Sequence, residues 1–220
     1  MRALVIGASG GIGAALAARL ADGGAAVTGV SRRADGLDVT DEASIARVFS
    51  RLEGEFDLVL CATGGLQIGA HGPEKTLKAL QLPGLAAQFA LNAAGPALVL
   101  KHALPLMPRD RRAVFAALSA RVGSIGDNRA GGWYGYRASK AALNQLIHSA
   151  AIEVARSNPQ AVIVSLHPGT VTTPLTEKYL GRHPAVSAET SADNLLRVIS
   201  GLAPEDSGRF YDWAGKEIPW

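Results

Sequence analysis

A tyrosine and a lysine four positions apart are the residues best suited to chemistry. Tyr136 and Lys140 lie in a run predicted to be helical, so their side chains face the same side. A free tyrosine has a pKa near ~10 and is a poor acid or base at neutral pH. A lysine cation close by is expected to lower that pKa by stabilising the phenolate. The pair could then donate a proton to a carbonyl oxygen that is being reduced, or take one in the reverse reaction.

A glycine-rich turn near the start of the chain predicts a dinucleotide site. Residues 2–6 predict a strand and residues 12–21 a helix. Glycines at such a turn let the backbone approach a pyrophosphate, and the helix N-terminus offers free N–H groups and a partial positive charge. The alternative is a tight turn that binds nothing. The residues of this turn are Gly7, Ser9, Gly10, Gly11, Ile12 and Gly13.

The end of the second predicted strand, residues 25–30, indicates which dinucleotide would bind. Many NAD-binding proteins place an acidic residue there to hold the ribose 2′-OH. This chain has Ser31, Arg32 and Arg33 instead, and guanidinium groups pair with a 2′-phosphate. We therefore expect NADP(H) rather than NAD(H). Two arginines on a solvated turn are the alternative, and Asp35 lies close enough in sequence to weaken the preference.

These motifs together resemble the short-chain dehydrogenase/reductase family. The spacing Gly7-x-x-x-Gly11-x-Gly13 matches its fingerprint, and YRASKAALN, from Tyr136 onward, follows in the family's order. The resemblance runs from residue 1 to about residue 211, and GSIGDN and GGWY are similar to the branch of C-factor and Sniffer-like carbonyl reductases. It implies hydride transfer between NADP(H) and a carbonyl or alcohol substrate, with Tyr136 as general acid or base assisted by Lys140.

The resemblance implies roles for further residues. Asn92, in a helix predicted over residues 83–105, would hold a water of the proton relay, unless it is a surface asparagine. Asp38 and Val39 would flank the adenine, and Lys140 would also hold the nicotinamide ribose. The turn after the strand at 58–61 and a Pro-Gly-x-Val-x-Thr loop would contact the cofactor. Their residues are Cys61, Ala62, Thr63, Gly64, Pro168, Gly169, Val171 and Thr173. His167, just before this loop, is expected to be structural.

One family position departs from the pattern. The family's strand ends in two serines, the second of which polarises the substrate carbonyl, whereas Ala120 takes that place here. We expect Ser119 to fill the role, with Ser124 as an alternative, although side-chain alternation along a strand could turn Ser119 away. The departure leaves a second hypothesis open: an NADP(H)-binding signalling or regulatory protein with little turnover.

The elements that must position these residues alternate between strands and helices. This alternation predicts a single α/β domain, residues 1–220, with a Rossmann-type doubly wound parallel sheet. Further strands are expected at 58–61, 113–118, 162–166 and 209–211, and helices at 40–52 (with Thr40 as N-cap), 74–81, 83–105, 133–157 and 188–200. Residues 32–36 are too few for a helical crossover to the apolar piece at 37–41, so this crossover is shortened. Either the third strand is vestigial or a bare loop reaches it.

Composition excludes several classes of protein. Hydrophobic residues make up 48% and charged residues 19%, which is typical of a folded domain. The net charge is +3 with scattered basic residues, so we expect no nucleic-acid partner. The single cysteine, Cys61, allows no internal disulfide and is compatible with the cytoplasm. Glycines interrupt the apolar N-terminus, so neither a signal peptide nor a membrane span is expected, and no metal cluster is found.

Substrate and assembly are less constrained by the sequence. A substrate cap is expected from residues 175–187 and from the loop near 66–75. Apolar residues on the helix that carries Tyr136 would serve either a homodimer or the core.

Overall fold

The structure, a computed structural model, describes residues 1–173, 176 and 185–220. Its centre is a six-stranded parallel sheet in the order β2-β1-β3-β4-β5-β6. The central strands β3 and β4 are buried along their whole length, as expected for a sheet covered on both faces. The strands are β1 (Arg2–Ile6), β2 (Ala26–Val30), β3 (Leu58–Cys61), β4 (Ala113–Leu118), β5 (Ala161–His167) and β6 (Phe210–Asp212).

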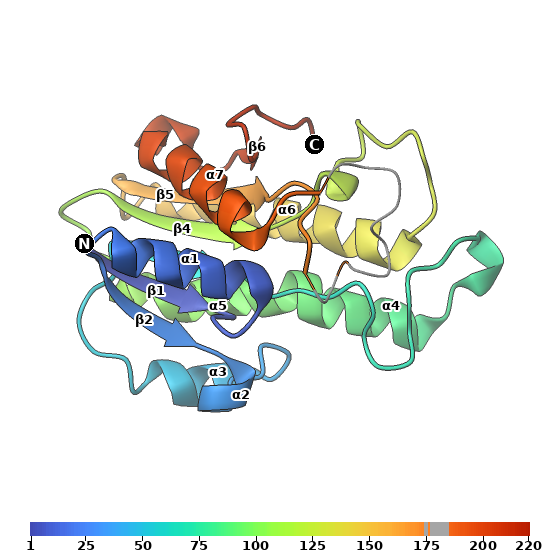
Figure 1. The fold of residues 1–220 in the computed structure, drawn as a ribbon, viewed down its shortest axis with the longest axis horizontal. Helices are drawn as coiled ribbons and strands as arrows, with labels where there is room; N and C mark the ends of the chain where they lie inside the picture. Colours follow the sequence, from blue (N-terminus) through green and yellow to red (C-terminus); the bar gives the residue numbers. More distant parts are fainter. Residues whose placement is uncertain (174–175, 177–184) are drawn as a thin grey trace.

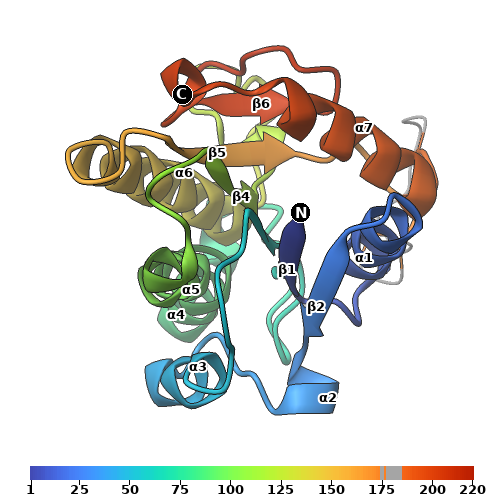
Figure 2. The same cartoon turned by 90° about the vertical axis from the view of Figure 1, so that its left-hand side faces the viewer.

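Helices cover both faces of the sheet (Figures 1 and 2). Helices α1 (Gly11–Asp22) and α7 (Ala188–Gly201) lie on one face, and α4 (Leu82–Phe89), α5 (Gly95–Ala103) and α6 (Tyr134–Val154) on the other. Alternate strand residues divide the core accordingly: Phe115 and Ile163 pack toward α5 and α6, whereas Ala116 and Val164 pack toward α1 and α7. The predicted doubly wound Rossmann-type domain is confirmed.

The connection after β2 is short, as predicted, and the part of the chain described there has no strand at 37–41. Ser31 caps a one-turn helix, α2 (Arg32–Asp35), by accepting a hydrogen bond from Ala34 N. The chain then reaches β3 through α3 (Glu42–Phe49). The N-cap of α3 is Asp41, which accepts from Ala43 N. The prediction of Thr40 as the cap is wrong, because Thr40 N and Oγ1 both donate to Asp38.

The helix predicted over residues 83–105 corresponds to an observed run, residues 82–106, that consists of several pieces. A π-helical turn at Ala90–Ala94 separates α4 from α5, and a 3₁₀ turn follows at Leu104–Leu106. By length and composition alone this run could cross a membrane, but α4 and the π-helical turn pack against α6, as in the core of a globular domain. A π-helical turn adds a residue and re-aims the side chains around it, often at functional sites. Asn92 lies in the middle of this turn.

The helix predicted at 74–81 is wrong. This stretch has a single 3₁₀ turn, Leu77–Ala79, within a segment that projects beyond α4 (Figure 1, right). Leu77, in this turn, is 65% exposed, so the turn buries little apolar surface against the body of the protein. A short helix is marginal without such packing.

Candidate active site

The glycine turn lies where β1 ends and α1 begins. Gly7 has a φ of 88°, which glycine adopts without strain, and a Cβ at Gly13 would overlap the carbonyl oxygen of Gly7. Among the described residues, no side chain caps the start of α1, and its first turn carries no acidic residue. The first N–H groups of the helix can therefore bind an anion. The turn fits a pyrophosphate.

Two clefts meet at this turn. The inner cleft, about 510 Å³, runs from Ser9–Gly13 past Ala62–Gly64 to Tyr136 and Lys140. The outer cleft, about 470 Å³, runs from Gly7 to Ser31–Arg33 and Leu37–Val39. They share residues of both turns, so together they form one elongated site. The predicted cofactor residues that line one or both clefts are Gly7, Ser9, Gly10, Gly11, Ile12, Gly13, Ser31, Arg32, Arg33, Asp38, Val39, Ala62, Thr63, Gly64, Tyr136, Lys140, Pro168 and Thr173.

Three residues predicted for the same site lie beside the clefts rather than along them. Cys61 is buried with its Sγ 3.4 Å from Thr63 Oγ1, and burial raises the pKa of its thiol. Val171 is also buried. Gly169 lines a neighbouring cavity, described below.

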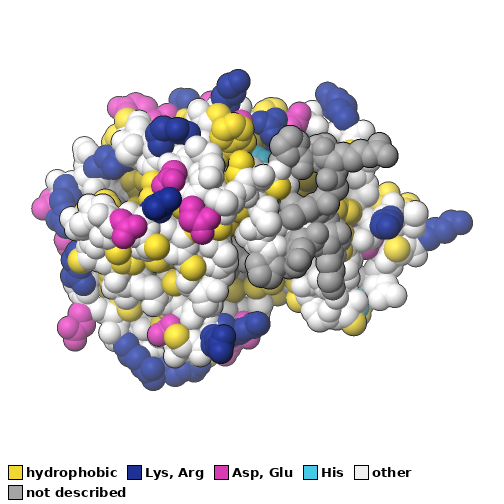
Figure 3. Space-filling view, in the orientation of Figure 1, with side chains coloured by type: hydrophobic (Ala, Val, Ile, Leu, Met, Phe, Trp, Pro, Cys, Tyr) yellow, Lys and Arg dark blue, Asp and Glu magenta, His cyan; other side chains and the backbone are white. Residues whose placement is uncertain are grey.

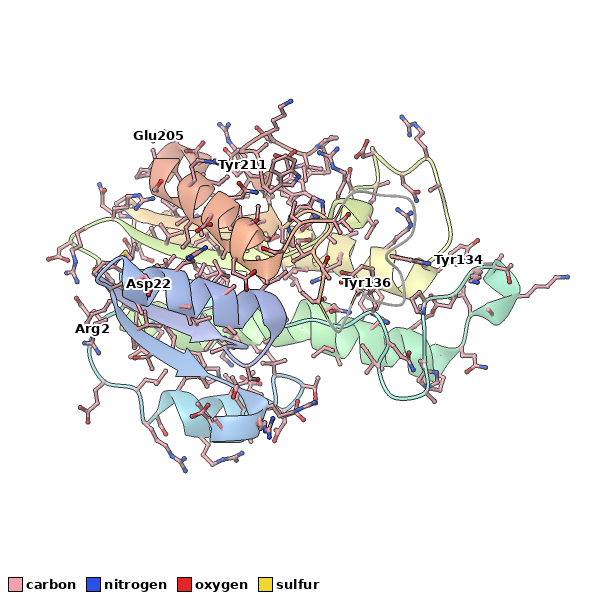
Figure 4. The ribbon with its side chains drawn as sticks, viewed as in Figure 1. Arg2, Asp22, Tyr134, Tyr136, Glu205 and Tyr211 are labelled. Atoms are coloured by element: carbon pink, nitrogen blue, oxygen red, sulfur yellow. The ribbon has the colours of Figure 1, made fainter. Side chains whose placement is uncertain are left out.

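Tyr136 and Lys140 lie in the first turns of α6, at the end of the inner cleft (Figure 4 labels Tyr136). Lys140 Nζ is 6.0 Å from the centre of the Tyr136 ring and donates to Leu118 O at 2.8 Å. Burial raises the pKa of Tyr136 to about 12 and lowers the pKa of Lys140 to about 8. The expectation that Lys140 lowers the pKa of Tyr136 is therefore wrong for this arrangement. Desolvation outweighs an ammonium that is bonded to the end of β4.

Asn92 is fully buried and holds the turn after β3. Its Nδ2 donates to Gly65 O at 2.9 Å and to Gln88 Oε1 at 2.6 Å, and its Oδ1 accepts from Gly65 N at 2.8 Å. A Cβ added to Gly64 would lie 3.0 Å from Asn92 Oδ1 and 3.4 Å from Lys140 Nζ. Asn92 and Lys140 therefore both border Gly64, and the alternative of a surface asparagine is wrong.

The hydroxyl groups of the two candidate serines are engaged elsewhere. Ser119 lines the inner cleft, but its Oγ donates to Asn144 Oδ1 on α6 at 2.7 Å. Ser124 is buried, and its Oγ accepts from Asp127 N at 3.0 Å. Ala120, at the family's serine position, faces a different cavity next to Tyr136. A methyl group cannot donate a hydrogen bond, so this position offers the substrate no hydroxyl.

That cavity, called here the side cavity, has a volume of about 440 Å³ and shares Tyr136 with the inner cleft. Trp133 meets the Tyr136 ring edge-on, with centroids 6.3 Å apart and an interplanar angle of 68°. Residues 175 and 177–184 of the expected substrate cap lie outside the described residues. The remaining lining residues of the side cavity are Leu66, Ala120, Arg121, Val122, Ala130, Gly131, Arg137, His167, Gly169, Thr170 and Thr176.

Two residues that fix the start of α6 were not among the predicted site residues. Glu74 Oε2 accepts from Gly135 N at 3.0 Å and so caps the helix from the projecting segment. Arg137 Nε donates to Gly132 O at 2.9 Å, and its Nη1 donates to Val122 O at 3.4 Å. Glu74 is remote from the helix in sequence, so no local pattern could identify it. Arg137 stands inside the Tyr136–Lys140 motif and could have been considered there.

The acidic residues near the outer cleft are engaged with the backbone. Asp35 Oδ2 accepts from Ser31 N at 2.7 Å. Asp38 Oδ1 accepts from Thr40 Oγ1 at 2.7 Å and from Thr40 N at 2.9 Å, and these hydrogen bonds lower the pKa of Asp38. Arg32 and Arg33 are exposed at the rim of the cleft. The rim therefore presents guanidinium groups.

The described residues contain no candidate metal site and, on the face in view, no continuous basic surface. Among the described residues, no group of three or more His, Cys, Asp or Glu side chains could hold a metal ion. Figure 3 shows basic and acidic side chains interspersed over the described part of the face in view, rather than a continuous basic stripe.

Comparisons with known proteins agree with this geometry. A family model described as short chain dehydrogenase matches residues 1–182. The chain is 40% identical to the C-signal of Myxococcus xanthus over 137 residues, which are 62% of this chain and 78% of that protein. It is 30% identical over 233 residues to the 1-hydroxy-2-glutathionyl-2-methyl-3-butene dehydrogenase of Rhodococcus sp. (strain AD45), covering 99% and 98% of the two chains. The NADPH-bound carbonyl reductase from chicken fatty liver has a similar fold, with a TM-score of 0.80, 25% identity and coverage of 100% and 98%.

Proposed function

The chain belongs to the short-chain dehydrogenase family, and we propose that it is an NADP(H)-dependent oxidoreductase that transfers hydride between the cofactor and a carbonyl or alcohol. One observation carries this proposal: Tyr136 lines both the inner cleft, which fits a dinucleotide, and the side cavity. A substrate in the side cavity would contact Tyr136, the residue that this cavity shares with the cofactor cleft.

The chain's own residues would bind the reactants and move the proton. A bound nicotinamide supplies or accepts the hydride. Because burial raises the pKa of Tyr136 to about 12, the phenol carries its proton at neutral pH and can give it to the substrate oxygen during reduction. Lys140 would hold the nicotinamide ribose and stabilise the phenolate once that proton has left. Asn92 would hold the turn that lies next to the lysine.

NADP(H) is the cofactor we infer. Arg32 and Arg33 at the rim of the outer cleft can pair with a 2′-phosphate, and the Asp35 carboxylate is bonded to Ser31 N rather than lining the cleft. The chicken liver carbonyl reductase of similar fold binds NADPH. We further propose a cytoplasmic protein with a small-molecule substrate.

A homodimer through α6 is part of the same proposal. Leu146 and Ile152 on α6 are 41% and 52% exposed, and Phe89 on α4 is 40% exposed. Exposed apolar side chains on neighbouring helices favour association. A monomeric mass in sedimentation at micromolar concentration would contradict the dimer and leave the rest of the proposal standing.

A second candidate function is supported by a specific observation. Ala120 stands where the family's substrate-polarising serine is expected, and the chain is 40% identical to the C-signal over 137 residues. An NADP(H)-binding signalling or regulatory protein with little turnover would need the cofactor cleft but not this hydroxyl.

The test is a cofactor titration followed by a substrate screen. NADPH and NADH are titrated by cofactor fluorescence, and aldehydes, ketones and quinones are then added while NADPH absorbance is followed. We expect NADPH to bind more tightly and Tyr136→Phe to bind it while losing turnover. Binding without turnover by the natural protein would favour the signalling candidate. If neither cofactor binds, the assignment of the glycine turn is wrong.

A further inference from the structure

The side cavity contains a histidine that takes no part in the binding and proton transfer described above. His167 is the last residue of β5 and lines this cavity together with Tyr136 and Ala120. The cavity thus brings together the expected proton donor, the position that lacks a serine, and an imidazole.

The strand geometry directs His167 toward the helix that carries Tyr136. Residues of β5 alternate between the two faces of the sheet, and Ile163 packs with the α6 side of the core while Leu166 packs with the other side. His167 is four residues after Ile163 and therefore points to the α6 side. In the register of the two strands, Leu118 is opposite Leu166, so His167 follows directly beside the end of β4 that leads to Ala120.

The two ring nitrogens of His167 have different surroundings. Nδ1 is enclosed and has no hydrogen-bond partner among the described residues. Nε2 is not enclosed, and no described residue bonds to it, so it is the nitrogen that opens to the cavity. An enclosed N–H without a partner is rarer in proteins than an enclosed acceptor without one. This difference favours the tautomer that carries its proton on Nε2.

The ring is also neutral at physiological pH. Its pKa is lowered to about 4, first by burial and then by the cation of Arg121, while the carboxylate of Asp212 acts in the opposite direction. Arg121 and Asp212 form an ion pair at 3.1 Å, which offsets much of their separate effects on the imidazole. His167 therefore presents a neutral N–H donor toward the cavity.

We propose that His167 donates a hydrogen bond from Nε2–H to the oxygen of the carbonyl substrate, the role that a serine hydroxyl at position 120 would otherwise fill. This inference rests on the proposed oxidoreductase function. During reduction the hydride adds to the carbonyl carbon, the electron pair of the C=O π bond moves to oxygen, and Tyr136 gives that oxygen its proton. His167 keeps its own proton throughout and stabilises the negative charge that develops on oxygen.

The first test compares turnover and cofactor affinity. Loss of one such donor costs about 100-fold in kcat, so we expect His167→Ala to fall by about that factor while its Kd for NADPH changes less than about twofold. His167→Gln, which retains an N–H donor, should recover part of the rate. Ala120→Ser in the His167→Ala background should also recover part, because it restores a hydroxyl to the same cavity. His102→Ala on α5 is the matched control and should leave kcat unchanged.

A second measurement does not depend on turnover. Nitrogen-15 NMR of the histidine rings should show His167 as the neutral Nε2–H tautomer, with no titration above pH 5. Addition of NADP⁺ and isobutyramide, an amide that resembles a carbonyl substrate and is not reduced, should move the Nε2–H proton downfield.

The outcomes separate the two proposals. If the natural protein reduces carbonyls and His167→Ala does so equally well, the role of His167 is overturned and the oxidoreductase function stands. A charged ring, or a proton on Nδ1, also overturns the role of His167 alone. If the natural protein turns over no carbonyl compound, both proposals fall.

Discussion

Lys140 is a residue whose burial serves the site but lowers the stability of the fold. The side chain is 2% exposed, and its Nζ donates to Leu118 O at 2.8 Å. Burial disfavours the ammonium and lowers the pKa of Lys140 to about 8, whereas an unfolded lysine titrates near ~10.4. Between these values the unfolded chain binds more protons than the folded one, so the contribution of Lys140 to stability rises with pH across this window.

Lys140→Met should therefore stabilise the protein at neutral pH and abolish turnover. We expect its free energy of unfolding, measured with urea in the absence of cofactor, to exceed that of the natural protein by about 1–2 kcal/mol at pH 7, since the lost hydrogen bond to Leu118 O offsets part of the gain. The difference should shrink at pH 9.5. The raised pKa of Tyr136 acts in both proteins and only above pH ~10, so it leaves this window undisturbed.

The control for this prediction is Lys101→Met. Lys101 is 64% exposed and pairs with Glu42 at the surface, where an ion pair is worth less than about 1 kcal/mol. It should show no gain that disappears with rising pH. A Lys140→Met protein no more stable than the natural one at pH 7 would contradict the buried-cation account.

Residue types could be predicted from the sequence, but the surroundings of each residue could not. Tyr136, Lys140 and the glycines follow from spacing on one helix and one turn, and all of them line the inner or outer cleft. The expected direction of the Tyr136 pKa shift is wrong, because the shift depends on burial, which the spacing of the motif does not reveal. Ser119 points at Asn144 for the same kind of reason: its partner comes from a distant helix.

At the scale of elements, α6 is the helix that the site depends on most, and its start is held by another segment. The carboxylate of Glu74 accepts from Gly135 N, one residue before Tyr136. Trp133, just before the helix, adopts a φ of 50°, an unfavourable conformation for a bulky residue. The projecting segment thus supplies the cap, and Leu66, earlier in the same connection, lines the side cavity together with Tyr136.

Glu74→Ala should loosen the start of α6. We expect a loss of about 1 kcal/mol in stability, typical of a lost cap, and a fall in kcat with little change in NADPH affinity, because the glycine turn is remote from Glu74. Glu74→Gln keeps an acceptor and should lie between. Denaturation and steady-state kinetics measure both effects. Glu55→Ala, which removes an exposed partner of Arg111, is the control; equal losses of kcat in the two variants would rule out a specific role for the cap.

The strands and helices were predicted correctly where burial and periodicity agree. The prediction was wrong where a local helix propensity is not supported by packing against the rest of the protein. All six strands of the sheet were expected within two residues of their observed bounds. The apolar piece at 37–41 forms no strand in the described structure. Its apolar side chains, Leu37 and Val39, are instead buried on the α3 and α5 side of the core. The break at Ala90–Ala94 inside a predicted continuous helix has no clear signal in the sequence.

For the whole molecule, the parallel sheet explains why residues far apart in sequence share one site. The carboxyl ends of β1, β3, β4 and β5 lead respectively to the glycine turn, the Ala62–Gly64 turn, Ala120 and His167. All strands run in the same direction, so these ends meet at one edge, where ligands of such sheets bind. The outer cleft, inner cleft and side cavity follow one another along this edge, an order that suits a 2′-phosphate, a nicotinamide and a substrate.

Cofactor binding should consequently stabilise the whole domain. The preference for NADPH over NADH should depend on the residues at the rim of the outer cleft. A ligand at about 100 times its Kd adds about 2.7 kcal/mol to the free energy of unfolding. At equal concentrations we expect NADPH to raise the melting temperature more than NADH. Arg32→Ala/Arg33→Ala should remove most of this difference by weakening the binding of NADPH while sparing that of NADH, and added salt should reduce it in the natural protein.

The control is the double variant Arg47→Ala/Arg51→Ala, which changes exposed residues on and just after α3. It makes the same change in net charge away from the rim and should preserve the difference. If both double variants behave alike, the preference arises from overall charge and not from these two guanidinium groups.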